Sequence, residues 1–134
     1  MNACMPIDSI RISLDECLLL GALLQLPGVI QTFQELVPAD APASQPERFA
    51  RARQTLLEKG WITVQPGPVI AIQASVAGFL QAIETADGAI QARDDQIRRL
   101  FVLESGFMEM EEVDADTYLL TMLDTVGAAR GLYA

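Results

Sequence analysis

The spacing of hydrophobic residues changes along the chain, from a helical repeat in the early part to a two-residue alternation near the end. The first signal is a short strand, because Ile10 and Ile12 alternate with polar residues. Ser13 and Glu16 then have the spacing of a capping box, which predicts that a helix begins there. That helix is hydrophobic on nearly all sides, so we expect it to be buried.

A second helix, a third helix, a hairpin and a fourth helix are predicted next. The third helix should end at Gly60, since glycine is the usual C-terminal stop. Strand patterns at 61–65 and 69–73 flank a Pro-Gly-Pro sequence that suits a type II turn. The order strand, three helices, hairpin and helix predicts a winged-helix-like arrangement for residues 10–87.

Residues 87–96 carry no clear pattern, and we interpret them as the boundary between two subregions. Beyond them, strand patterns at 97–104 and 107–113 flank a Ser-Gly sequence that is typical of a hairpin turn. Residues 117–123 fit either a third strand or a short helix, and the neighbouring strands favour the strand. A last helix is predicted after Asp124.

The sequence thus predicts one α+β domain spanning residues 1–134. Its first subregion, residues 10–87, is the winged-helix-like helical part. Its second subregion, residues 97–134, holds a small antiparallel sheet of about three strands and the C-terminal helix.

Charge and composition argue against several functions. The 134 residues include nine Lys and Arg against eighteen Asp and Glu, which gives a net charge of −9. This field repels phosphate, so it opposes nonspecific binding to nucleic acid and to anionic membranes. The longest hydrophobic run, residues 14–26, carries two acids and is too short to cross a bilayer.

No residue pattern indicates catalysis. His is absent, so the usual general base and the commonest metal ligand are both missing. The sequence contains no phosphate-binding glycine loop and no nucleophile elbow. Cys4 and Cys17 are interpreted as reduced thiols of a cytoplasmic protein. Cys17 lies near a helix N-terminus but among leucines, which favours a buried, inert thiol. We therefore expect a protein without enzymatic activity and without a cofactor.

Five of the eight residues in 109–116 are acidic, but they lack the alternating spacing and central glycine of a calcium loop. In a strand, Glu109 and Glu111 would share one face and Met108 and Met110 the other. We interpret the acids as charges that keep an exposed sheet edge soluble, and we assign no metal site.

The third helix and the hairpin have the local pattern of a recognition helix and wing. Arg48, Arg51 and Lys59 lie off the hydrophobic face, and residues 44–60 have a local charge of +2. The tip of the hairpin has no basic residue, however, and the rest of the chain carries −11. Trp61, the single Trp, either closes the core or offers an aromatic anchor. These four residues are the candidate contacts to a protein partner or to DNA.

The stretches SLDECLLLGALLQLPGV and FARARQTLLEKGWITVQPGPVIAIQASVAGFL resemble the N-terminal half of the EspG family, the cytosolic chaperones of type VII (ESX) secretion. The family's Ala-x-x-x-Leu-x-x-x-Gly segment with a following apolar residue is matched by Ala52, Leu56, Gly60 and Ile62. The resemblance covers residues 10–123 and implies that the late strands correspond to the family's sheet.

EspG proteins are about twice as long and consist of two similar halves, so this chain resembles one half. The resemblance therefore implies a homodimer. No local motif here matches the family's substrate-binding residues, and none is carried over.

We expect a non-catalytic protein–protein interaction role, adaptor-like or chaperone-like, in a homodimer with a possible further protein partner. The alternative is a winged-helix transcriptional regulator that binds DNA through residues 46–73. A regulator needs Arg48, Arg51 and Lys59 exposed on one ridge, whereas an interaction module buries part of the ridge or balances it with acids. A small-molecule binder with an apolar cavity is a third possibility that the sequence leaves open.

Overall fold

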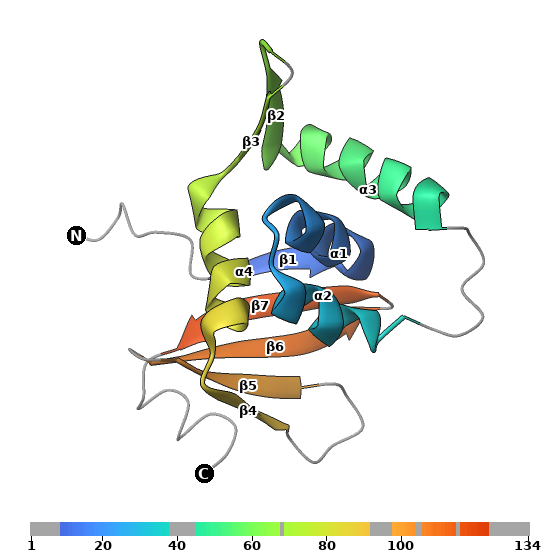
Figure 1. The fold of residues 1–134 in the computed structure, drawn as a ribbon. Helices are drawn as coiled ribbons and strands as arrows, with labels where there is room; N and C mark the ends of the chain where they lie inside the picture. Colours follow the sequence, from blue (N-terminus) through green and yellow to red (C-terminus); the bar gives the residue numbers. More distant parts are fainter. Residues whose placement is uncertain are drawn as a thin grey trace. The chain divides into compact units, whose positions relative to one another are not determined.

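The computed structural model describes residues 9–37, 45–67, 69–91, 98–103, 106–114 and 116–123. The chain forms two compact units. One unit is continuous in sequence, Ser13–Glu84, and contains the described helices and a hairpin. The other unit combines Met1–Ile12 with Thr85–Ala134 and contains a five-stranded sheet. Figure 1 shows the elements of both units.

The helical unit begins with α1 (Leu14–Leu23), which starts at the predicted capping box. The Ser13 hydroxyl accepts a hydrogen bond from the backbone N–H of Glu16 at 3.1 Å, and the Glu16 carboxylate accepts one from the N–H of Ser13 at 2.9 Å. The prediction of a buried helix is confirmed, because its buried residues lie on several sides: Leu14, Glu16, Cys17, Leu18, Leu20 and Gly21.

The second helix, α2 (Pro27–Gln34), lies close against α1. A Cβ atom at Gly21 of α1 would lie 3.1 Å from Cγ1 of Val29, so the glycine permits this close approach. The residue before α2 provides no side-chain cap. Glu84 of α4 (Ala74–Thr85) does so instead, since its carboxylate accepts a hydrogen bond from the N–H of Val29 at 3.0 Å.

The third helix, α3 (Gln45–Lys59), ends as predicted at Gly60, which has a φ of 75°. The N–H groups of Gly60 and Trp61 bond to the carbonyls of Leu57 and Leu56 at 3.1 and 3.0 Å, a Schellman ending. The chain then enters a two-stranded sheet of β2 (Ile62–Gln65) and β3 (Val69–Ile72).

The second unit is a five-stranded sheet with the order β1-β7-β6-β5-β4. Its strands are β1 (Ser9–Ser13), β4 (Gly88–Gln91), β5 (Arg98–Leu103), β6 (Gly106–Asp114) and β7 (Thr117–Leu123). Neighbours from β4 to β7 pair antiparallel. Residues 117–123 are therefore a strand, which confirms the favoured alternative. In β6, Met108 and Met110 are fully buried and the intervening acids are half-buried, as the alternation predicts.

The α+β class is confirmed, but three details differ from the prediction. The sheet has more than the expected three strands, because β1 joins it and because β4 forms inside the segment interpreted as a boundary. A four-residue strand is too short to give a clear two-residue period. β6 lies in the centre of the sheet, so its acids do not protect an edge.

A winged-helix arrangement would place the first strand beside the hairpin. Here β1 lies next to β7, and the sheet of β2 and β3 has no further strand. The order of elements in residues 10–87 is thus the expected one, but the winged-helix assignment is not confirmed. The helix predicted after Asp124 and the thiol of Cys4 lie outside the described residues.

Candidate functional site

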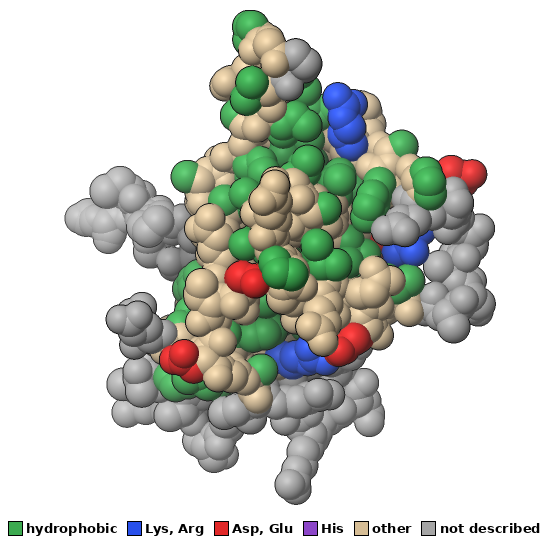
Figure 2. Space-filling model, viewed as in Figure 1, with side chains coloured by type: hydrophobic (Ala, Val, Ile, Leu, Met, Phe, Trp, Pro, Cys, Tyr) green, Lys and Arg blue, Asp and Glu red, His purple; other side chains and the backbone are tan. Residues whose placement is uncertain are grey.

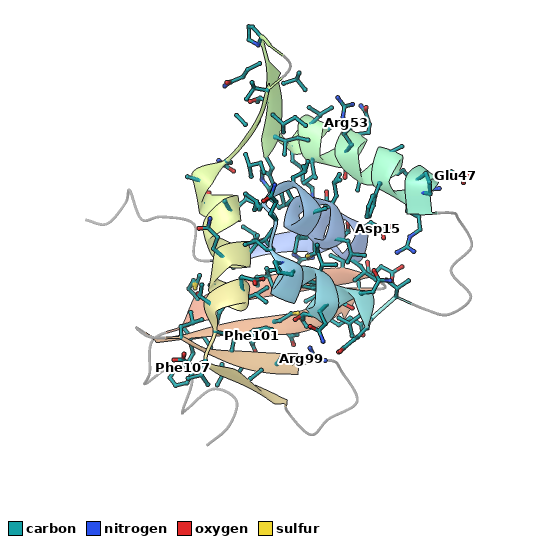
Figure 3. All side chains as sticks on the ribbon, in the orientation of Figure 1. Asp15, Glu47, Arg53, Arg99, Phe101 and Phe107 are labelled. Atoms are coloured by element: carbon teal, nitrogen blue, oxygen red, sulfur yellow. The ribbon has the colours of Figure 1, made fainter. Side chains whose placement is uncertain are left out.

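The first turn of α1 is joined to α3 by ion pairs. Asp15 lies at the N-terminal end of α1, between α1 and α3 in Figure 3. The Nε atom of Arg48 donates a hydrogen bond to Oδ1 of Asp15 at 3.0 Å, and the same oxygen also pairs with Nη2. The side chain of Arg48 is only 15% exposed. This guanidinium is therefore held against α1 and away from solvent.

Glu16, the next residue, is a buried carboxylate with several partners. Its side chain is 2% exposed and accepts hydrogen bonds from the Ser13 N–H, from the Thr55 hydroxyl at 2.6 Å and from Nζ of Lys59 at 2.9 Å. A buried charge is tolerated only when it is paired and hydrogen-bonded. Lys59 and Thr55 supply those partners from α3, so the pairing fixes how α1 and α3 pack together.

Lys59 also contacts the aromatic ring of Trp61. Its Nζ atom lies 4.4 Å from the centre of that ring, a cation–π distance. The Schellman ending of α3 brings Trp61 to this place, since it reverses the chain directly after Lys59. The ammonium group is thus placed between a carboxylate and an indole within one unit.

The positions of the basic residues around α3 determine which of them are exposed and which face α1. Arg48, Thr55 and Lys59 fall on one flank of the helix at 3.6 residues per turn, and their printed partners show that this flank faces α1. Arg53 falls on the opposite flank. Arg51 and Arg53 are both exposed.

The four candidate residues therefore have different surroundings. Lys59 and Trp61 lie together, Arg48 is paired near the other end of α3, and only Arg51 is an exposed arginine. In the part of the chain that the structure describes, the basic ridge is thus partly balanced by the acids of α1.

The hairpin presents hydrophobic side chains to solvent. Val64, Val69 and Ile70 are 50, 53 and 38% exposed, which marks them among the exposed large hydrophobic residues. No charged residue occurs in 61–73, although a fifth of the chain is charged. Figure 2 shows hydrophobic side chains along the hairpin and a basic side chain beside it, where Figure 3 labels Arg53 in the same orientation. Val64 and Ile70 are opposite each other and share one face of the hairpin, whereas Val69 pairs with Gln65 and lies on the other face. We call Val64, Ile70 and Arg53 the hairpin surface.

The sequence pattern indicates only Trp61 of this region as a candidate contact and does not predict the hairpin surface. The available signal was the absence of any charge in residues 61–73. The exposure of a hydrophobic strand cannot be read from its pattern, because a two-residue alternation shows which residues share a face and not whether that face is covered.

Other groups offer little chemistry. Burial raises the pKa of the Cys17 thiol well above its ordinary value, the negative charge of Glu16 raises it further, and Lys59 lowers it. A thiol of this kind stays protonated and unreactive. Within the described ranges, no group of three or more Cys, Asp or Glu residues is placed to hold a metal ion.

Comparison of the sequence with models of known protein families gives no match, and a search of curated proteins returns no significantly similar sequence. Among the helices of the described residues, none is both long enough and apolar enough to span a membrane.

Proposed function

We propose that this chain is a non-catalytic protein-binding protein, adaptor-like or chaperone-like, and that it contacts its partner through the hairpin surface. The observation that carries this proposal is the exposure of Val64 and Ile70, paired on one face of a hairpin without charge, in a protein of net charge −9. Exposed hydrophobic side chains that are gathered together typically mark sites of protein association.

The ion pairs of α3 support this role over DNA binding. A recognition helix needs free cations for phosphates and bases. Arg48 and Lys59 already bind Asp15 and Glu16, and releasing Lys59 would leave the buried Glu16 carboxylate without its charge partner. Two of the three basic residues on the expected ridge are therefore engaged inside the unit.

The proposal includes a cytoplasmic homodimer, as the cysteine content and the resemblance to EspG chaperones lead us to expect. It includes no enzymatic activity, since Cys17 is buried and protonated and the sequence lacks His.

Site-specific photo-crosslinking in cells of the natural source tests the proposal. A photoreactive amino acid at position 64 should give discrete protein adducts that nuclease treatment does not change. The same amino acid at Gln31, an exposed position of α2, serves as the matched control and should give few adducts. Adducts that nuclease removes, or equal labelling from both positions, would contradict the proposal.

Binding to DNA is measured separately by fluorescence anisotropy with a labelled duplex at low ionic strength, where phosphate attraction is strongest. We expect no binding. A saturable complex that dissociates as salt is added would favour the regulator that contacts DNA through residues 46–73.

A further inference from the structure

We propose that the outer edge of β2 accepts an extended segment of the partner as an added strand, and that this segment carries aliphatic side chains and at least one carboxylate that meets Arg53. The inference rests on the proposed function and specifies the chemistry of the partner. It is carried by the backbone of β2, the side chains of the hairpin and the charge beside it.

The backbone of β2 has an open edge. β2 pairs with β3 alone, with Val64 opposite Ile70. The N–H of Gln73 bonds to the carbonyl of Trp61 at 2.8 Å, and hydrogen-bonded pairs alternate along an antiparallel ladder. Val64 therefore belongs to a non-bonded pair, and its own N–H and C=O point away from β3. Among the described residues, no strand satisfies these outward groups.

The side chains of the hairpin suit an added aliphatic strand. Ile62 and Val64 share a face, and the register places Ile72 and Ile70 opposite them on the same face. Ile62 is 1% exposed and Val64 is 50% exposed, so one hydrophobic face runs from the core out to solvent. Natural edge strands usually carry a charge that prevents pairing, and β2 carries none. Main-chain bonds from such an edge give affinity, and the exposed aliphatic face gives selectivity.

Arg53 determines the charge of the occupant. It is exposed on the flank of α3 that faces away from the α1 acids, and Figure 3 shows it on the side of α3 from which the hairpin projects. No described acid is paired with it, in contrast to Arg48 and Lys59. A carboxylate on the incoming segment would complement this guanidinium.

Two other occupants fit less well. A second copy that pairs through its own β2 edge would bring a strand without charge, so this strand would offer no carboxylate to Arg53. A lipid surface offers no strand that could pair with the outward N–H and C=O groups of Val64. The combination of an uncharged edge and the exposed guanidinium of Arg53 therefore favours an aliphatic peptide segment that carries a carboxylate.

A displayed library of random short peptides tests the inference with the full chain as bait. We expect the enriched peptides to share alternating Val, Ile or Leu residues and an Asp or Glu at one end. An absence of enrichment, or enrichment of basic or helical sequences, would overturn the inference. The proposed function would still stand if position 64 forms protein adducts in cells, so the two failures can be told apart.

Charge variants then test whether the carboxylate of the enriched peptide lies beside Arg53. Arg53→Glu should weaken its binding by about threefold to tenfold and should improve binding of a version with Lys in place of the acid. Arg51→Glu is the matched control, because Arg51 is also exposed on the same helix but lies toward the α1 flank. Equal losses in the two variants would show that only the overall charge matters and would overturn the role of Arg53.

Backbone variants test strand addition itself. Val64→Pro removes an N–H that β3 does not use, so the hairpin should persist while peptide binding falls by about tenfold or more. Ile70→Pro removes the corresponding group on the opposite edge, and it should weaken binding less. Circular dichroism confirms that both variants fold, and unchanged binding of Val64→Pro would overturn pairing at the β2 edge.

Co-sedimentation of the protein with neutral phosphatidylcholine vesicles, lost in Val64→Pro, would show that a membrane occupies the hairpin instead.

Discussion

Cys17 shows how one buried residue makes stability depend on pH. Its folded-state pKa is raised by burial first and by Glu16 second. Above the ordinary thiol pKa of about 8.5, the unfolded chain loses this proton while the folded chain keeps it. The unfolded state then binds fewer protons, so the free energy of unfolding falls as pH rises.

We therefore predict a steeper alkaline loss of stability in the natural chain than in Cys17→Ala. The difference in slope should approach about 1.4 kcal/mol per pH unit above the ordinary thiol pKa and vanish near neutral pH. Urea unfolding over a series of pH values measures it for both proteins. The comparison of slopes removes the constant cost of the cavity that alanine leaves, and parallel slopes would contradict the buried, protonated thiol.

Gly28 leaves room for the carboxylate that caps α2. A Cβ atom at this position would lie 2.8 Å from Oε1 of Glu84, the atom that accepts the N–H of Val29. We predict that Gly28→Ala displaces the carboxylate and lowers the free energy of unfolding by about 1 kcal/mol, the usual value of an N-cap.

Gly78 in α4 provides the control for this substitution, because a Cβ atom there would meet nothing within 4 Å. Gly78→Ala should raise stability by about 0.5–1 kcal/mol, since alanine is the better helix former. Thermal and urea unfolding measure both variants. Stabilisation by both alanines would show that Glu84 has no capping role.

At the scale of elements, the ion pair of Glu16 with Lys59 joins α1 to α3. Lys59→Met keeps the length of the side chain but removes the charge that compensates Glu16. We predict a loss of about 1–3 kcal/mol in the free energy of unfolding. The lower part of this range applies because the Lys59 side chain is 37% exposed and solvent screens its charge.

A double-mutant cycle isolates the pair. Glu16→Gln combined with Lys59→Met should cost less than the sum of the single variants, with a coupling energy of about 0.5–3 kcal/mol. The exposed Gln54–Glu58 contact on the same helix gives the comparison, and Glu58→Gln should change stability by less than about 0.5 kcal/mol. If the changes in the free energy of unfolding of the two single variants simply add, Glu16 and Lys59 are not energetically coupled, which would contradict the prediction.

The ends of helices were predictable because they depend on nearby residues. The capping box at Ser13 and the stop at Gly60 involve partners within a few positions, and both occur as expected. The neighbours of β1 depend on a segment far along the chain, and nothing local specifies them. The ion pairs of Arg48 and Lys59 could not be predicted from local sequence either, because their acidic partners belong to another helix. A basic residue has the same pattern whether it is free or paired.

At the scale of the whole molecule, the negative net charge should make dimerisation depend on ionic strength. Two copies with a charge of −9 each repel, and added salt screens that repulsion. If the chain forms the homodimer that we propose, this dimer should become tighter as ionic strength rises from low to physiological values. Light scattering coupled to size-exclusion chromatography measures the dimer fraction. A dimer that dissociates on adding salt would require an interface built on opposite charges, and a monomer at all concentrations would exclude the homodimer.

The neighbouring positions of β1 and β7 have a consequence for biosynthesis. The strand Thr117–Leu123 is translated long after Ser9–Ser13, the strand beside which it lies. The helical unit Ser13–Glu84 is continuous and has all its own segments well before that point. We expect it to form first on the nascent chain, while β1 waits with an unpaired edge. A pause in translation before β7 would therefore prolong the period in which a nascent chain is open to aggregation.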